Sequence, residues 1–175
     1  MKTSGIIRRI DELGRIVIPK EIRKTLRIKN GDNLEIVVDD ETIILKKYSH
    51  IKNLEYMANI YAESFYQVLK YNIIITDTDR VVAVSGNLKN KYLDAEISEM
   101  IERMIDRRDT TVTRKKANIE ISKDSSEFCY YAMSTIINNG DSIGSVIIIS
   151  TENPLLEQEE KLSLILANIL SNYFV

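Results

Sequence analysis

The sequence predicts an α+β protein with two domains, a small β-rich domain followed by a larger α+β sandwich. Charge is the first observation that separates them. Residues 1–29 hold nine Lys or Arg against three acids, a net +6, whereas the whole chain of 175 residues carries −2. Hydropathy is the second, because residues 54–175 alternate strand-like and helix-like apolar patterns over a length that can enclose its own core. We therefore predict a basic domain at residues 1–53 and a second domain at residues 54–175.

The first domain begins with two predicted strands. Residues 3–10 and 15–18 are short runs rich in Ile and Val, which is typical of strands. Residues 11–14 between them predict a turn in which Gly14 supplies a positive φ.

A short helix and a hairpin complete this domain. Pro19 is expected at the first helical position, where its missing N–H costs nothing, and an amphipathic helix follows over residues 20–26. Residues 30–32 end that helix. Residues 34–38 and 42–47 predict two strands of a hairpin.

A domain this small needs a further stabilising device. Domains of such length usually rely on disulfides, a metal or a partner chain. The single cysteine lies elsewhere and there is no cluster of metal ligands, so a partner chain remains. We expect an obligate dimer, which also doubles the basic surface.

Residues 49–53 are interpreted as a linker, and a connecting helix is predicted over residues 54–69 from apolar positions at helical spacing. The apolar stripe of this helix packs either against its own domain or against the same helix of a second copy.

The second domain is predicted to contain an antiparallel sheet with helices on one face and at both ends. Helices are expected around Ile97–Ile105 and after Pro154, and residues 138–141 predict a hairpin turn. The expected strands span residues 72–76, 80–85, 110–112, 118–121, 127–137 and 142–150.

Residues 5–23 read GIIRRIDELGRIVIPKEIR, and residues 32–36 and 43–48 read DNLEI and IILKKY. These segments closely resemble the AbrB-type (SpoVT/AbrB) swapped-hairpin DNA-binding domain. The remaining chain resembles the regulators of that type in which this domain is joined to a GAF-like domain. The resemblance implies that two chains interleave their hairpins into one barrel, that the barrel binds double-stranded promoter DNA, and that sporulation-stage genes are controlled.

The candidate DNA-binding residues are Arg8, Arg9, Arg15, Arg23 and Lys24. Arginine offers a planar fork to phosphate or guanine, whereas lysine acts as a point charge. The resemblance places the DNA contacts of the family on these positions. Adjacent strand residues face opposite sides, so Arg8 and Arg9 are not engaged equally, and one of them could instead pair with Asp11 or Glu12 of the partner chain. The alternative for the whole set is a solvated basic face.

No catalytic constellation is present in the sequence, so we expect no enzyme, no cofactor and no metal. Cys129 has no nearby His and is interpreted as a small buried side chain, and His50, the single histidine, lies in the linker. Gly140-Asp141-Ser142 is explained by hairpin-turn chemistry rather than by a nucleophilic serine.

The second domain either binds an unidentified small molecule or serves oligomerisation alone. Pocket candidates, chosen by their neighbourhood only, are Ser85, Asn87, Tyr130 and Tyr131.

No apolar run approaches the length of a membrane helix, the first residues lack the pattern of a signal peptide, and one cysteine fits a reducing compartment. We therefore expect a cytoplasmic protein that does not engage membranes. The leading interpretation is a homo-oligomeric transcription regulator, with tetramer assembly or signal sensing by the second domain. The alternative is an antitoxin-like or scaffold protein that uses the barrel to hold a protein partner, but such antitoxins carry a disordered tail where this chain has a globular pattern.

Overall fold

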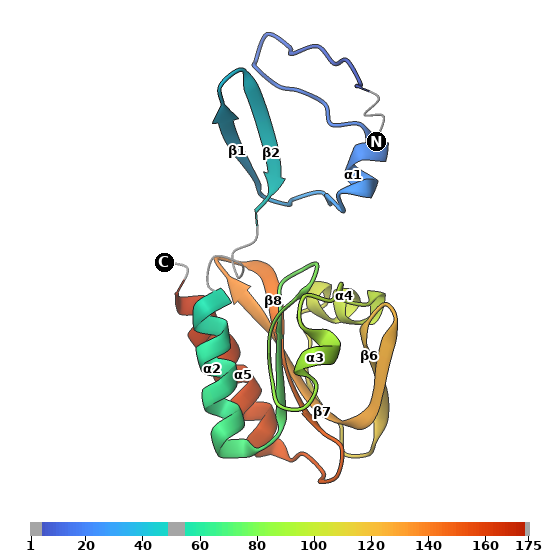
Figure 1. Cartoon of the computed structure of the whole chain (residues 1–175), viewed down its shortest axis with the longest axis vertical. Coiled ribbons are helices and arrows are strands. Elements are labelled where there is room, and N and C mark those ends of the chain that lie inside the picture. The colour runs from blue at the N-terminus through green and yellow to red at the C-terminus, as the bar shows by residue number, and fades with distance from the viewer. Residues whose placement is uncertain (1–4, 49–54, 174–175) are drawn as a thin grey trace. The chain divides into compact units, whose positions relative to one another are not determined.

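The computed structural model describes residues 5–48 and 55–173, which form two separate compact units (Figure 1). The predicted linker at residues 49–53, including His50, and Leu54 at the start of the predicted helix lie outside the described residues.

The N-terminal unit holds one short helix and one β-hairpin. Helix α1 (Lys20–Thr25) follows Pro19, which is the N-cap rather than the first helical residue as predicted. Strands β1 (Leu34–Asp39) and β2 (Thr42–Lys47) pair antiparallel, as the sequence predicts, with Val37 opposite Ile44.

The two strands predicted at residues 3–10 and 15–18 are absent from the described residues 5–18, so this prediction is wrong for the single chain. Within residues 5–18 the backbone hydrogen bonds are confined to the turn, where Asp11 N–H donates to the Arg15 carbonyl and Gly14 N–H donates to the Asp11 carbonyl. Residues on either side of the turn have the composition of strands but no neighbouring strand to pair with, and a strand needs such a neighbour.

The C-terminal unit is built on an antiparallel sheet with the order β4-β3-β8-β7-β5, and β6 pairs with a further part of β7. The predicted turn at residues 138–141 joins the two longest strands, with Asn138 opposite Asp141. The strands are β3 (Asn72–Thr76), β4 (Val81–Ser85), β5 (Thr110–Val112), β6 (Ala117–Ser122), β7 (Ser125–Asn138) and β8 (Asp141–Ser150).

Helices cover both faces of this sheet, which corrects the prediction of helices on one face and at both ends (Figure 1). Helices α2 (Glu55–Leu69) and α5 (Glu157–Asn172) pack on one face, while α3 (Lys89–Tyr92) and α4 (Glu99–Asp106) lie on the other. The physical reason is visible in β3, where Ile73, Ile74 and Ile75 are all fully buried. Since successive strand residues face opposite sides, a continuous apolar run requires cover on both faces.

Candidate nucleic-acid interface

Charge is distributed unevenly within the N-terminal unit. Residues 5–29 carry eight Lys or Arg against three acids, a net +5, whereas residues 30–48 carry two lysines against five acids, a net −3. Clustered Lys and Arg neutralise the phosphates of a nucleic acid, and acids repel them. Any polyanion should therefore engage the unit through residues 5–29.

Arg15 is held in place by the turn that precedes it. The Asp11 carboxylate accepts hydrogen bonds from the backbone N–H of Leu13 at 3.0 Å and of Arg15 at 2.8 Å. Its second oxygen accepts from Arg15 Nε at 2.7 Å. Gly14 allows the turn to close, because its φ of 74° lies in the left-handed region. The turn thus presents an exposed guanidinium in one orientation.

These hydrogen bonds from the Arg15 backbone and side chain, with that from Leu13, lower the pKa of Asp11 from its usual 3.8. Asp11 therefore stays ionised at neutral pH. Its carboxylate orients the Arg15 side chain and neutralises part of the charge of that side chain. Asp11 thus pairs with Arg15 of its own chain, whereas the sequence analysis allowed it to pair with Arg8 or Arg9 of a partner. An aspartate at the start of a turn that ends in Gly14-Arg15 was the signal that could have revealed this role.

The other candidate residues are exposed and free of ion pairs with any described residue. Arg8 and Arg9 lie on the irregular segment before the turn, while Arg23 and Lys24 lie on α1. Their charges are consequently available to an external anion, whereas that of Arg15 is shared with Asp11.

A second acidic residue, Asp32, links the hairpin to the segment that follows α1 through a hydrogen bond and an ion pair. Its carboxylate accepts a hydrogen bond from the Lys29 backbone N–H at 2.7 Å and lies 3.3 Å from Lys47 Nζ. The sequence predicts only that Asp32 helps to end the helix. The bond between positions 32 and 47 fixes the orientation of β2 relative to the loop.

The N-terminal unit has almost no buried residues as a single chain. Among residues 5–48 only Pro19 is buried, and large apolar side chains such as Ile7, Leu13 and Val17 are 92%, 75% and 75% exposed. Burial of apolar area is the dominant favourable term in folding, so this unit lacks the usual source of stability.

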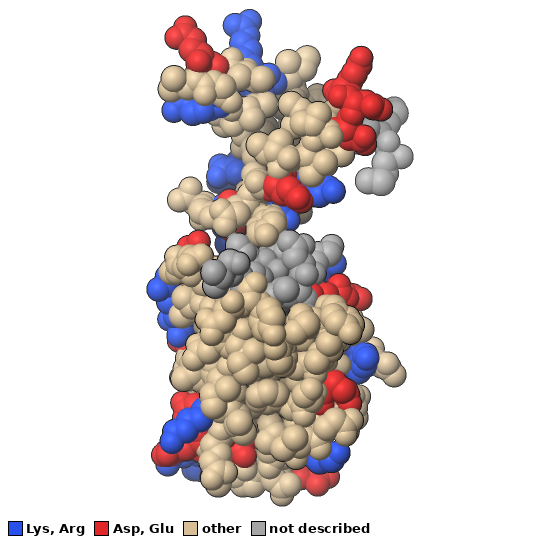
Figure 2. All heavy atoms as spheres, turned by 90° about the vertical axis from the view of Figure 1, so that its left-hand side faces the viewer, with Lys and Arg blue, Asp and Glu red and all other residues tan. Residues whose placement is uncertain are grey.

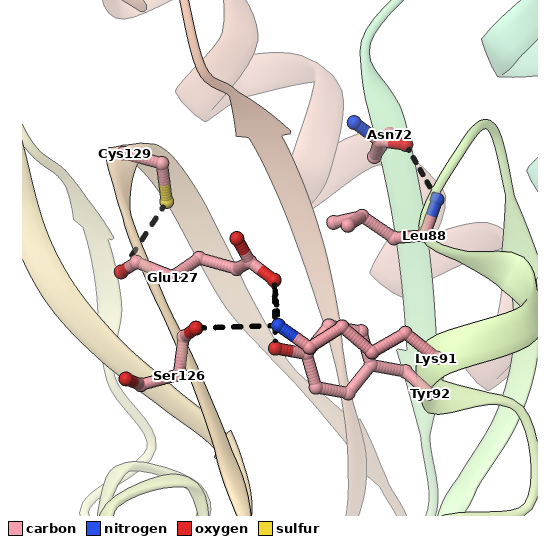
Figure 3. Close-up of polar contacts among 7 residues, drawn as sticks. All are labelled: Asn72, Leu88, Lys91, Tyr92, Ser126, Glu127 and Cys129. Carbon is pink, nitrogen blue, oxygen red and sulfur yellow. Dashed lines mark hydrogen bonds and ion pairs between the residues drawn. The ribbon is translucent and has the colours of Figure 1, made fainter.

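In the C-terminal unit, Glu127 on β7 anchors the short helix α3. Its Oε1 accepts hydrogen bonds from Lys91 Nζ at 2.7 Å and from the Tyr92 hydroxyl at 2.8 Å (Figure 3). Burial, followed by the bond to Glu127, raises the pKa of Tyr92 to about 12. Cys129, two residues along the strand, is buried as predicted, and burial raises the pKa of its thiol to about 11. The thiol is therefore protonated at neutral pH.

The four pocket candidates do not form one site. Tyr131 is packed in the core on the α3/α4 side, and Tyr130 packs against the core on the α2/α5 side. Ser85 is buried at the end of β4, and Asn87 lines a pocket with residues that the sequence did not single out. Adjacent positions 130 and 131 separate because they alternate across the strand.

The outer face of α2 and α5 is nearly free of Lys, Arg, Asp and Glu side chains (Figure 2). Apolar side chains at least a third exposed on these helices and just beyond α5 are Tyr56, Ile60, Val68, Leu164, Ile165 and Tyr173. Patches of this kind mark association surfaces.

Within the described ranges, no helix is long and apolar enough to cross a membrane, and no group of three or more His, Cys, Asp or Glu could hold a metal ion.

Comparisons with known proteins assign both units. The family described as "Stage V sporulation protein T C-terminal, transcription factor" matches residues 53–174, and the one described as "Antidote-toxin recognition MazE, bacterial antitoxin" matches residues 7–53. Stage V sporulation protein T of Bacillus subtilis (strain 168) is 46% identical over 163 residues, 92% of each chain.

Two further likenesses concern one unit each. The transition state regulatory protein AbrB of the same organism is 67% identical over 48 residues, which cover 27% of this chain and 50% of that protein. The GAF domain of a phosphoenolpyruvate-protein phosphotransferase from Coxiella burnetii gives a TM-score of 0.57 at 16% identity, over 68% of this chain and 80% of that one. The predicted fold class, an AbrB-type domain followed by a GAF-like α+β sandwich, is confirmed.

Proposed function

The chain belongs to the stage V sporulation protein T family of transcription factors, and we propose that it binds promoter DNA through residues 5–29 of a dimeric N-terminal unit. It is a DNA-binding regulator of sporulation-stage transcription with an AbrB-type domain and a GAF-type domain. The observation that carries the proposed site is the net charge of +5 on residues 5–29, next to a hairpin half of net −3.

Within this site Arg8, Arg9, Arg23 and Lys24 contribute charges that face no acid of the described chain, and Arg15 contributes a guanidinium oriented by Asp11. A phosphate that binds Arg15 must share it with that carboxylate. Arg15 is therefore suited to fix the position of the protein on the DNA. Arg23 and Lys24 are suited to attract DNA phosphates without regard to sequence.

We propose that the active species is a homo-oligomer. In the N-terminal unit, the unpaired apolar segments at residues 5–10 and 15–18 and the near absence of buried residues support a barrel completed by a second chain. In the C-terminal unit, the face of α2 and α5 that is nearly free of charged side chains supports pairing of dimers into tetramers.

The match of residues 7–53 to an antitoxin family supports a second candidate, capture of a protein partner by the same barrel. The packed GAF-type unit stands where such antitoxins carry a disordered tail, which favours DNA over a toxin as the main partner.

The chain acts by binding rather than by catalysis in this proposal, as its transcription-factor relatives suggest. We place it in the cytoplasm, where it can reach the chromosome.

The deciding experiment is mapping of the DNA bound by the full chain, followed by gel shifts on the recovered promoters. Arg15→Ala and Arg23→Ala should each weaken the shift while circular dichroism remains that of the wild type. Binding that both substitutions leave unchanged would remove these residues from the site, and a chain that retains no promoter DNA but retains a protein partner would favour the second candidate.

A further inference from the structure

A pocket of about 240 Å³ opens at one end of the C-terminal sheet, where α2 leads into β3 and β8 ends. Its wall combines groups from three segments that are far apart in the sequence. Tyr66, Lys70 and Asn72 come from the end of α2 and the start of β3, Asn87 follows β4, and Ser150 and Glu152 come from the end of β8 and the residues after it. The pocket lies entirely within the C-terminal unit.

Asn72 supplies a hydrogen-bond donor that has no acceptor among the described residues. Only 9% of the surface of this residue is exposed. Its Oδ1 accepts a hydrogen bond from the Leu88 backbone N–H at 3.2 Å (Figure 3). That bond assigns the oxygen, so the Nδ2 donors point away from Leu88, and no described residue accepts from them. These donors remain accessible from the pocket, where they can bond to water or to an acceptor that enters it.

Gly86 leaves room for the amide in this position. Its φ is 106°, and a Cβ at this position would collide with Asn72 Oδ1 and lie 3.1 Å from Tyr66 Cε2. A side chain at position 86 would therefore displace the Asn72 amide or the Tyr66 ring. A donor that is fixed before binding costs less entropy when its acceptor arrives.

A cation stands at the same pocket. The Lys70 ammonium lies 5.7 Å from the centre of the Tyr66 ring and pairs with no carboxylate among the described residues. The Ser150 hydroxyl accepts a bond from Asn153 N–H at 3.0 Å, which leaves its own proton free to donate. The three donors, Asn72 Nδ2, the Ser150 hydroxyl and the charged Lys70 Nζ, match an anion with two acceptor oxygens.

We propose that this pocket binds a small organic monocarboxylate, with one oxygen near Asn72 Nδ2 and the other near Lys70 Nζ. Glu152 on the exposed rim disfavours a more highly charged anion such as phosphate. The inference is independent of the DNA-binding proposal, since it concerns only the C-terminal unit.

The test titrates the full-length chain, labelled with ¹⁵N, with acetate and L-lactate at neutral pH. The matched amides, acetamide and lactamide, serve as controls that keep size but lose charge, and inorganic phosphate tests anion selectivity. Each probe is raised to about 10 mM, a concentration that would occupy most of a site with a Kd of about 1 mM. We expect shifts of the Asn72 side-chain amide and of the Thr151 backbone amide with the carboxylates alone.

Two variants test the donors. Asn72→Asp keeps an acceptor for Leu88 N–H but replaces the donor by an anion, and should abolish binding. Lys70→Gln, at an exposed position, should weaken binding about tenfold or more without affecting the fold. Lys115→Gln, an exposed lysine outside the pocket, should bind as the wild type does, and Glu152→Gln should bind more tightly.

The proposal is overturned if no pocket amide shifts with either carboxylate, or if the amides or phosphate bind as well as the carboxylates. It is equally overturned if Lys70→Gln, with an unchanged unfolding temperature, retains wild-type affinity.

Discussion

Replacing Arg23 by alanine should weaken DNA binding and make it less sensitive to salt. Arg23 is exposed on α1, outside the structure's cores, and forms no ion pair with a described residue. Its removal should therefore leave the fold unchanged and take away one full positive charge from each chain.

The size of the effect follows from counterion release. The proposed dimeric barrel would present two copies of Arg23, and each phosphate contact contributes about 0.9 to the slope of log K against log salt concentration. Loss of both contacts should flatten that slope by about 1.8. Over a fourfold rise in salt, from about 50 to about 200 mM, the ratio of wild-type to variant affinity should consequently fall by about 12-fold.

Fluorescence anisotropy on a labelled promoter fragment, repeated at five or six salt concentrations, measures this slope. Lys46→Ala is the matched control, because Lys46 is exposed on β2, opposite Glu35, in the half of the unit that carries net −3. A wild-type slope for Arg23→Ala would refute the placement of DNA on α1. An equal change for Lys46→Ala would show that the effect reports total charge rather than a site.

Three further predictions concern the turn, the sheet and the helical face. The pKa of Asp11 is lowered in the folded protein, so its hydrogen bonds stabilise the turn fully above pH 3.8 and are lost as the pH falls through the folded pKa. A ¹³C titration of the Asp11 carboxyl group should therefore give a midpoint below 3.8. A higher midpoint would contradict the observed hydrogen bonds. Gly86→Ala should lower the free energy of unfolding, measured in urea, by about 1–3 kcal/mol. Gly140→Ala should lower it less, because both glycines have a positive φ but only position 86 is crowded. Equal losses would argue against the close approach of position 86 to Asn72. Ile165→Asp should reduce the proposed tetramer to a dimer in light scattering, whereas Asn90→Asp, exposed on α3 on the other side of the sheet, should not. An unchanged mass for Ile165→Asp would exclude the α2/α5 face as the interface.

The elements that the sequence predicts well are those specified by neighbouring residues. The turn at residues 138–141 and its flanking strands are found because Asn-Asn-Gly-Asp between two apolar runs determines a hairpin locally. Helix α5 is found because its apolar positions repeat at helical spacing.

The errors arise where structure depends on residues distant in sequence or absent from the chain. The segments at residues 3–10 and 15–18 have strand composition, yet no described segment of the same chain pairs with residues 5–18. The cover on both faces of the sheet was missed although Ile73-Ile74-Ile75 signals it, because the run was interpreted only as a strand.

The candidate site was predictable in its charges and not in its geometry. A count of Lys and Arg locates the basic segment, but the bond from Arg15 Nε to Asp11 depends on how the turn closes. The pocket at Asn72 could not be assembled from the sequence, since its wall joins residues 66, 70–72, 87 and 149–153, which only the folded sheet brings together.

The scarcity of buried residues in the N-terminal unit links folding, assembly and DNA binding in one equilibrium. If a barrel acquires its core only from a second chain, then dilution removes the fold together with the DNA site. The C-terminal unit has two hydrophobic clusters of its own, and in the proposed oligomer it would keep two N-terminal units near each other and so raise their effective concentration. A fragment of residues 1–53 should accordingly lose both its circular dichroism and its DNA affinity as it is diluted, while the full chain retains both at the same concentration. A fragment that stays folded as a monomer in analytical ultracentrifugation would show that the core does not depend on a partner, and the argument for an interleaved barrel would fail.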